Sequence, residues 1–159
     1  ATVSPSNAQG TVQFKIDGQP LGAAVEIEDG EARSAAITTL APGTHEVSAV
    51  YSGDVNFAPT VVAITQTVAK VGTSTTLTAS ATSTTYGSPV TLTAKVTPAS
   101  GGLGNPSGSV SFVQGATTLA TVPVAAGSGN TAQATFTAAD LGAGTHGIKA
   151  VYSGSDIHR

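Results

Sequence analysis

The chain of 159 residues contains no cysteine, no methionine and no tryptophan. Without cysteine, no disulfide bond holds the core together and no thiolate chemistry is available. Phenylalanine and tyrosine together make up only 4% of the sequence. A hydrophobic core must therefore be built mainly from valine, isoleucine, leucine and alanine.

Charged residues are also scarce, at 9% of the chain, with a net charge of −3. The charge is uneven, because residues 1–69 carry a net −5 and residues 70–159 a net +2. No basic patch is present to neutralise phosphates, so nucleic-acid binding is not expected. No apolar run approaches the roughly 20 residues that span a bilayer, so membrane insertion is not expected either.

One stretch of eleven residues occurs twice, at Gly43–Gly53 and Gly144–Gly154. The copies are identical at eight of eleven positions and lie 101 residues apart. Each is interpreted as a turn, a strand and a second turn, forming a late strand of a β-sandwich unit. The spacing predicts two units of ordinary domain size, at residues 1–69 and 70–159. Lys70-Val71-Gly72 joins them without a free linker.

Strand patterns fill the rest of the chain. Val12, Phe14 and Ile16 alternate with polar residues, and Asp17-Gly18 and Asp29-Gly30 are strong hairpin turn signals. The patterns predict strands at residues 11–16, 21–27, 35–40, 44–51 and 61–68, and at 74–81, 90–96, 109–112, 119–124, 134–136 and 146–152. A long glycine- and proline-rich loop is predicted at 98–108. We therefore expect an all-β chain.

The strand pattern predicts that the sequence is out of phase with its own repeat. The first unit has no counterpart of residues 74–96, so it is expected to lack its N-terminal strands. The second unit has no counterpart of residues 61–68, so it is expected to lack its last strand. Each sandwich is then incomplete, and an incomplete sandwich exposes an unpaired sheet edge.

Three motifs occur in order: Gly-Ser/Thr-Val-x-Phe at Gly10 and Gly108, Leu-x-x-Gly-Thr-His at Leu40 and Leu141, and Ala-Val-Tyr-Ser-Gly at Ala49 and Ala150. In these motifs the chain resembles the bacterial Ig-like repeat domains of large cell-surface and secreted proteins. The resemblance covers nearly the whole chain. It implies tandem seven-stranded sandwiches, and it supplies no catalytic residues.

The function that the resemblance implies is a structural or adhesive spacer of an extracellular protein, at the cell surface or secreted, without catalysis. Expected partners are neighbouring Ig-like repeats, a cell-surface glycan or protein, and another chain through strand pairing. Three alternatives stay open at this stage. They are a binding module for a glycan or host protein, an accessory module of a secreted polysaccharide-degrading enzyme, and a virion-surface Ig-like domain.

The repeated histidines and tyrosines are candidate site residues. His45 and His146 suit a metal ligand or general base, but a corner residue that hydrogen-bonds loop backbone is the favoured interpretation. Tyr51 and Tyr152 suit ligand stacking. The favoured interpretation places each ring on the rim of the core with its hydroxyl in water.

Oxygen-bearing side chains in the turn after the repeated strand are weak calcium candidates, namely Asp54, Asn56 and Asp156. Calcium takes six to eight oxygen ligands, and each turn offers one carboxylate. The favoured interpretation is that these side chains bond their own backbone. No catalytic residue and no cofactor are predicted, apart from this low expectation of calcium.

The acidic run Glu26, Glu28, Asp29 and Glu31 was weighed as an acid–base pair or a cation site. Alternation places Glu26 and Glu28 on the solvent face of a strand, so a solvated face is favoured. No serine lies in the Gly-x-Ser-x-Gly elbow of the hydrolase fold. The glycine loop at 101–108 is not a phosphate loop, because no lysine follows and no helix begins there.

Overall fold

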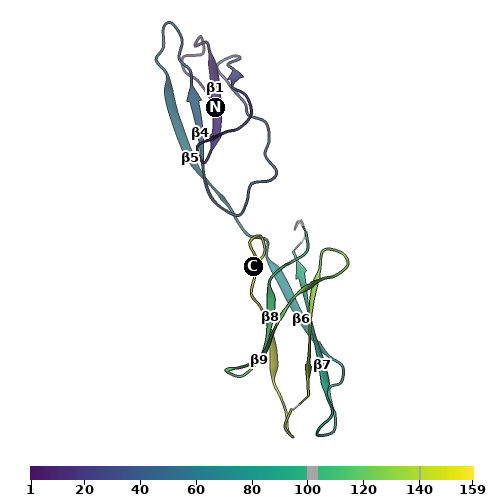
Figure 1. Ribbon diagram of the computed structural model, residues 1–159. Helices are drawn as coiled ribbons and strands as arrows, with labels where there is room; N and C mark the ends of the chain where they lie inside the picture. The colour runs from purple at the N-terminus through teal and green to yellow at the C-terminus, as the bar shows by residue number, and fades with distance from the viewer. Residues whose placement is uncertain (100–103, 140) are drawn as a thin grey trace. The chain divides into compact units, whose positions relative to one another are not determined.

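A computed structural model describes residues 1–99, 104–139 and 141–159, so part of the predicted 98–108 loop lies outside the described residues. The chain divides into two compact units, Ala1–Ala69 (unit 1) and Lys70–Arg159 (unit 2). Every regular element in the described ranges is a β-strand, as Figure 1 shows. The all-β prediction is confirmed, and the described residues contain no helix long and apolar enough to cross a membrane.

Unit 1 is a single antiparallel sheet. Its strands are β1 (Thr11–Ile16), β2 (Gln19–Pro20), β3 (Val25–Glu26), β4 (Gly43–Tyr51) and β5 (Thr60–Val68). They pair in the order β2-β1-β4-β5, and β3 also pairs with β1. Strand β5 therefore lies at the edge of this sheet.

Unit 2 is a sandwich of two antiparallel sheets. Its strands are β6 (Thr73–Ala79), β7 (Val90–Pro98), β8 (Ser109–Gln114), β9 (Thr117–Pro123), β10 (Ala125–Ala126), β11 (Ala132–Ala138) and β12 (Ile148–Tyr152). One sheet has the order β10-β11-β7-β6 and the other the order β12-β8-β9. The segment predicted as a joint belongs to this unit, since Val71 forms a parallel bridge with His158.

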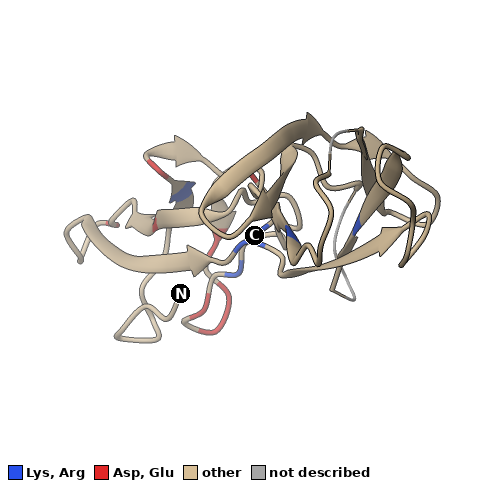
Figure 2. Ribbon diagram, turned by 90° about the horizontal axis from the view of Figure 1, so that it is seen from below, with Lys and Arg blue, Asp and Glu red and all other residues tan. Residues whose placement is uncertain are grey.

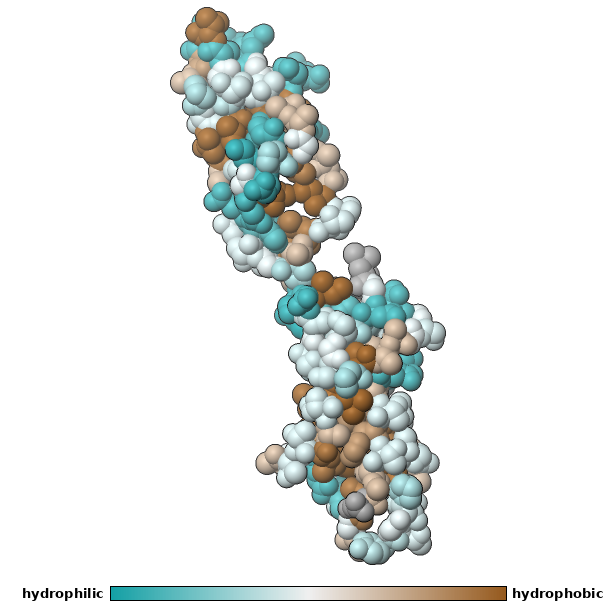
Figure 3. Space-filling model, in the orientation of Figure 1, coloured by the Kyte–Doolittle hydropathy of each residue, from teal (hydrophilic) through white to brown (hydrophobic). Residues whose placement is uncertain are grey.

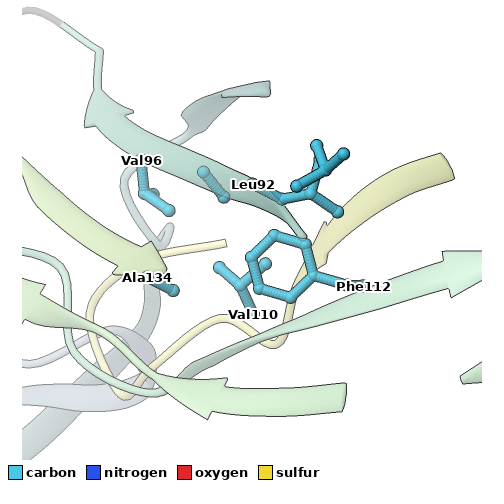
Figure 4. Packing of buried hydrophobic residues seen from close by; sticks show 7 residues of the cluster. Leu92, Val96, Val110, Phe112 and Ala134 are labelled. Carbon is cyan, nitrogen blue, oxygen red and sulfur yellow. The ribbon is translucent and has the colours of Figure 1, made fainter. Parts of the chain in front are cut away.

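The core of unit 2 lies between its two sheets. Strand β7 contributes Val90, Leu92, Ala94 and Val96, which alternate with polar residues as the sequence predicts, and all four are buried. They pack against Val110 and Phe112 of β8 and against Ala134 of β11, as Figure 4 shows. Because the aromatic content is low, most of this core is aliphatic, and the tilted ring pair Phe112–Phe136 is its aromatic part.

Unit 1 has a smaller core. Val12, Phe14 and Ala32 are its buried cluster, and most of the residues around them are only partly buried. The unit also carries most of the acidic residues, which are red in Figure 2. A single sheet buries less apolar area than a sandwich of similar length, so unit 1 gains less hydrophobic stabilisation from its own residues.

Both hairpin turns predicted in unit 1 form. Asp17 and Asp29 have φ of 49° and 50°, and the glycine after each also has positive φ. This is the backbone of a two-residue type I′ turn, which Asp-Gly favours. Ile16 therefore pairs with Gln19, and the N–H of Glu28 bonds the carbonyl of Glu31.

The predicted strand at 35–40 is wrong, because residues 33–42 form no strand. The corresponding strand of unit 2, β11, pairs with β7 along its whole length. The described residues of unit 1 include no strand in the place of β7. Residues 35–40 therefore have no ladder to join, and Ile37 stays 37% exposed.

Two other predicted strands differ in extent. The return strand predicted at 21–27 is reduced to β3 at Val25–Glu26, and β2 forms just before it at Gln19–Pro20; the two pair with opposite ends of β1. The second copy of the repeated stretch becomes extended only from Ile148, whereas β4 in the first copy begins at Gly43. β4 is longer because β5 pairs with it along all nine residues.

Replacing Phe112 tests the core of unit 2. Phe112 is fully buried, so Phe112→Ala should lower the free energy of unfolding of unit 2 by about 3–5 kcal/mol. Val151→Ala is the matched control, because Val151 is 53% exposed on β12. Urea unfolding followed by NMR signals of β7 and β8 measures both. Equal destabilisation by the two variants would contradict the assigned faces.

Candidate functional site

In each unit, the start of one strand (β1 or β8) is hydrogen-bonded to the turn that follows its neighbour (β4 or β12). The N–H of Thr11 donates to Ser52 Oγ at 3.0 Å, and the N–H of Ser109 donates to Ser153 Oγ at 3.0 Å. A Cβ on Gly10, whose φ is 102°, would lie 2.6 Å from Ser52 Oγ, so glycine is required there. The Gly-Thr/Ser and Tyr-Ser-Gly motifs therefore recur together because each is the contact partner of the other.

The repeated tyrosines join the same contact, and the expectation of a hydroxyl in water is wrong. Tyr51 is buried, and its hydroxyl donates to the carbonyl of Gln9 at 2.7 Å. The hydroxyl of Tyr152 donates in the same way to the carbonyl of Ser107. Burial raises the pKa of Tyr51 above its ordinary value of 10.0. Both tyrosines hold the loop before a strand, a role close to that of a tyrosine corner.

Asp54 uses both carboxylate oxygens within unit 1. Oδ2 accepts the N–H of Gln9 at 2.8 Å, and Oδ1 accepts the N–H groups of Asn56 at 2.7 Å and Phe57 at 2.8 Å. The bond from Gln9 is the main cause that lowers the pKa of Asp54 below its ordinary value. The favoured interpretation of a turn residue bonded to backbone is confirmed for Asp54.

The calcium candidates lie in the turn that follows the repeated strand of each unit. Asp54 and Asn56 lie in the turn of unit 1, and Asp156 lies exposed in the matching turn of unit 2. In the described ranges, no group of three or more His, Cys, Asp or Glu side chains is placed to hold a metal ion. A cation at Asp54 would compete with three backbone N–H groups. Calcium binding at these residues stays a prediction of low affinity.

His45 lies at the start of β4 and bonds two loops. Its Nε2 is 2.9 Å from the carbonyl oxygen of Ala41, which confirms the favoured interpretation of a corner residue. Its Nδ1 is 2.7 Å from Asp17 Oδ2, a contact across 28 residues that the sequence analysis missed. Asp17 Oδ1 also accepts the N–H of Glu46 at 2.9 Å. Both ring nitrogens face acceptors, so the protonated imidazolium satisfies both contacts.

The charges of this corner stabilise each other. The hydrogen bond to Asp17 raises the pKa of His45 above its ordinary 6.5, and the carbonyl of Ala41 adds to the effect. The same bond from His45 lowers the pKa of Asp17 below its ordinary 3.8, aided by the N–H of Glu46. The pair is thus an ion pair at weakly acidic pH.

His146 forms the matching corner in unit 2, against an uncharged side chain. Its Nε2 is 2.8 Å from the carbonyl oxygen of Gly142, as expected for a corner residue. Its Nδ1 contacts the side-chain amide of Gln114 at 3.0 Å. An amide offers both a donor and an acceptor, so this contact forms with an uncharged partner. The same motif therefore faces a carboxylate in unit 1 and a side-chain amide in unit 2.

The acidic run of unit 1 forms a solvated face. Glu26 and Glu28 are exposed, as predicted. Glu31 pairs with Arg33 at 2.8 Å, and this hydrogen bond lowers the pKa of Glu31 and raises that of Arg33. Asp29 belongs to the hairpin turn. Since the Glu31–Arg33 pair is exposed, it contributes little to stability.

Two features of unit 2 escaped the sequence analysis. His158 is fully buried, and its Nε2 has no hydrogen-bond partner among the described residues. Tyr86 is 81% exposed beside a hollow of about 710 Å³, lined in part by Leu77, Leu141 and His146. His158 corresponds to Phe57 when the two copies are aligned. An apolar residue at this position in the first copy indicates that the position faces the interior. Nothing in the sequence placed Tyr86 next to His146.

Comparison with known families identifies the fold of both units. The model of the bacterial Ig-like domain, group 3, matches residues 1–69 and residues 70–159. The chain belongs to this family. No curated protein and no solved structure shows significant similarity to it. Bacterial Ig-like domains are typically non-catalytic structural modules and are often extracellular.

The ionic corner makes the stability of the first Ig-like unit depend on pH. The raised pKa of His45 adds stability that is complete below 6.5 and declines as pH rises through the folded value. The lowered pKa of Asp17 adds stability that is complete above 3.8 and declines as pH falls through its folded value. Unit 1 should therefore unfold at the highest urea concentration between these two pH values.

Asp17→Asn should remove most of the decline above pH 6.5, because the asparagine carries no charge to hold the imidazolium. Urea midpoints of the β4 and β12 NMR signals between pH 4 and pH 9 measure this in both Ig-like units. Gln114→Ala in unit 2 is the control for loss of a histidine partner without loss of charge. A wild-type decline that persists unchanged in Asp17→Asn would contradict the assignment.

The tyrosine contact gives a second test. Tyr51→Phe removes the donor to the carbonyl of Gln9 and leaves that acceptor without its partner, so unit 1 should lose stability. Tyr86→Phe is the matched control, because its hydroxyl is exposed. Thermal unfolding followed by circular dichroism compares them. No difference between the two variants would show that the Tyr51 hydroxyl adds nothing.

Proposed function

We propose that this chain is a spacer segment of a bacterial extracellular protein, at the cell surface or secreted, whose two Ig-like units carry mechanical load and perform no catalysis. The observation that supports this best is the use of the polar side chains. His45 and Tyr51 each tie a loop to β4, Asp54 ties the loop before β1 to the turn after β4, and His146 and Tyr152 repeat the first two contacts. The repeated polar residues are thus bound to the chain's own backbone.

The connection between the units supports the same proposal. β5 ends at Val68, and the ladder of unit 2 already includes Val71. Two residues therefore separate hydrogen-bonded segments of different units. When force is applied to the chain, a short connection extends only slightly before the force reaches the folded units. This property suits a spacer.

Mechanical unfolding tests the spacer function. Pulling the chain by its two ends should give two separate steps, one for each Ig-like unit. Full extension of 69 and 90 residues corresponds to about 230–250 Å and about 300–320 Å, from which the length of each folded unit is subtracted. Extension without a resisted step would contradict a load-bearing role. Phe112→Ala should lower the force of the larger step only.

A second candidate function is glycan binding by unit 2, and it rests on Tyr86. An exposed ring beside hydroxyl-bearing residues suits stacking against a sugar, and the adjoining hollow includes Thr82, Ser83 and Thr84. Binding of the chain to an array of bacterial and host glycans tests this, with Tyr86→Ala as the variant. Equal signals from the wild type and Tyr86→Ala would reject this site.

Two further settings, an accessory module of a secreted polysaccharide-degrading enzyme and a virion-surface domain, use the same Ig-like unit as a spacer. The domains encoded beside this segment separate them from a cell-surface protein. A catalytic domain in the same polypeptide would favour the first setting, and a capsid or tail domain the second.

A further inference from the structure

The turn after the repeated strand holds a hydrocarbon ring in unit 1 and a histidine in unit 2. Asp54-Val55-Asn56-Phe57 aligns with Ser155-Asp156-Ile157-His158. The backbone of the turn is the same in both units. The N–H of Asp54 bonds the carbonyl of Phe57 at 2.8 Å. In the same way, the N–H of Ser155 bonds the carbonyl of His158 at 2.9 Å. The turn therefore forms without a histidine, and the imidazole of His158 is not needed to shape it.

The ring of His158 is enclosed in unit 2 and has one hydrogen-bond partner. The residue is fully buried, and its Nε2 has no partner among the described residues. Its Nδ1 lies 3.3 Å from Ser155 Oγ, which also accepts the N–H of His158 at 3.1 Å. A neutral ring can carry its proton at Nδ1 and leave Nε2 with only a lone pair. A protonated ring would place an N–H and a positive charge at Nε2, where no acceptor lies.

Unit 2 places no negative charge against this ring. Much of its surface is close to white in Figure 3, as expected where threonine and serine are common and charged residues are few. Its described charged side chains are all exposed: Lys70, Lys95, Lys149, Asp156 and Arg159. Nζ of Lys70 donates to the carbonyl of Ser155 at 2.6 Å, so the charge bonded to the turn is itself positive. The other described titratable groups are exposed or bonded elsewhere, namely Tyr86, His146 and Tyr152.

The turn that contains His158 also fastens the first residues of unit 2. The contacts between residues 70–73 and residues 155–159 are called the clasp. In the clasp, the N–H of Val71 bonds the carbonyl of Ile157 at 2.8 Å, and Val71 forms a parallel bridge with His158. Tension that reaches unit 2 from its amino-terminal side acts first on these bonds. A change at His158 therefore bears directly on how firmly unit 2 is closed.

We propose that His158 makes the clasp sensitive to acid, so that unit 2 loosens as the pH falls below about 6.5, the range in which histidine ordinarily gains a proton. The opened chain exposes the ring to water and takes up the proton, whereas the closed clasp offers the proton no acceptor. The contribution of the neutral ring is therefore complete above this range and is lost below it. In unit 1 the same acidity strengthens the His45–Asp17 pair, so the two units respond to acid in opposite directions.

Hydrogen exchange of the full chain tests the proposal. A short glycine–serine segment is added beyond Arg159, so that no terminal carboxylate lies near the ring. Protection factors of the N–H groups of Val71 and Ser155, measured at about pH 7.5 and about pH 5, report on opening of the clasp. The N–H of Asp54 is the matched reference in unit 1, because it makes the same turn bond. Two variants remove the titrating ring: His158→Phe supplies the residue of unit 1, and His158→Gln keeps a polar side chain.

The expected result is a loss of protection in unit 2 only. A proton taken up by the opened state alone shifts the opening equilibrium by up to about tenfold per pH unit. Protection of Val71 and Ser155 should therefore fall about tenfold or more on acidification, while that of Asp54 does not fall. Both variants of His158 should abolish the loss. His146→Gln should retain it, because His146 makes its bonds at the other corner of unit 2.

Three outcomes would overturn the proposal. Constant protection of Val71 and Ser155 in the wild type would show that acid does not loosen the clasp. The same loss in the wild type and in either variant of His158 would assign the acid response to another group. The ring ¹⁵N signals of His158 give a measurement that needs no variant. A ring that gains its proton while Val71 stays protected would show that the closed clasp accepts the charge.

Discussion

Burial of one apolar sheet face is the constraint on which both units depend. The residues of this face are Val-x-Phe on one strand and Ala-Val-Tyr on its neighbour, and both motifs occur twice in the sequence. A sheet with one apolar face gains its stability only when a second layer excludes water from that face. Unit 2 provides this layer from β6, β7 and β11, whereas the described part of unit 1 provides three residues of it.

The polar residues of the repeat follow from the same constraint. A sandwich with few aromatic residues and no disulfide has little to hold its loops against its strands, so hydrogen bonds must do so. Tyr51 and Asp54 both bond Gln9, and His45 bonds Ala41. These bonds fix the loops that enter and leave β1 and β4, the two strands that form the apolar face. The repeated polar side chains therefore have hydrogen-bond partners within their own unit.

The local sequence pattern predicted most of the strands and turns. The features that it did not predict depend on residues far apart along the chain. The alternation in β7 and the Asp-Gly turns depend on neighbouring residues, so both were predictable. The strand at 35–40 failed because a strand needs a partner, and its pattern carries no information on whether the partner is present. The His45–Asp17 pair joins residues 28 positions apart. The Tyr51 hydroxyl bonds a backbone carbonyl 42 positions away, and no side-chain pattern marks a carbonyl.

The two histidine corners show how a repeat family can vary its physical behaviour without changing its motif. Gly-Thr-His is the same in both copies, and both histidines bond the carbonyl four residues earlier. The difference lies in the hairpin that faces them, where Asp17 carries a charge and Gln114 does not. Asp17 and Gln114 do not occupy matching positions of the repeat, since Gln114 aligns with Ile16. The hairpin outside the motif therefore supplies the histidine with a different kind of partner in each unit, although the histidine and its carbonyl partner stay the same.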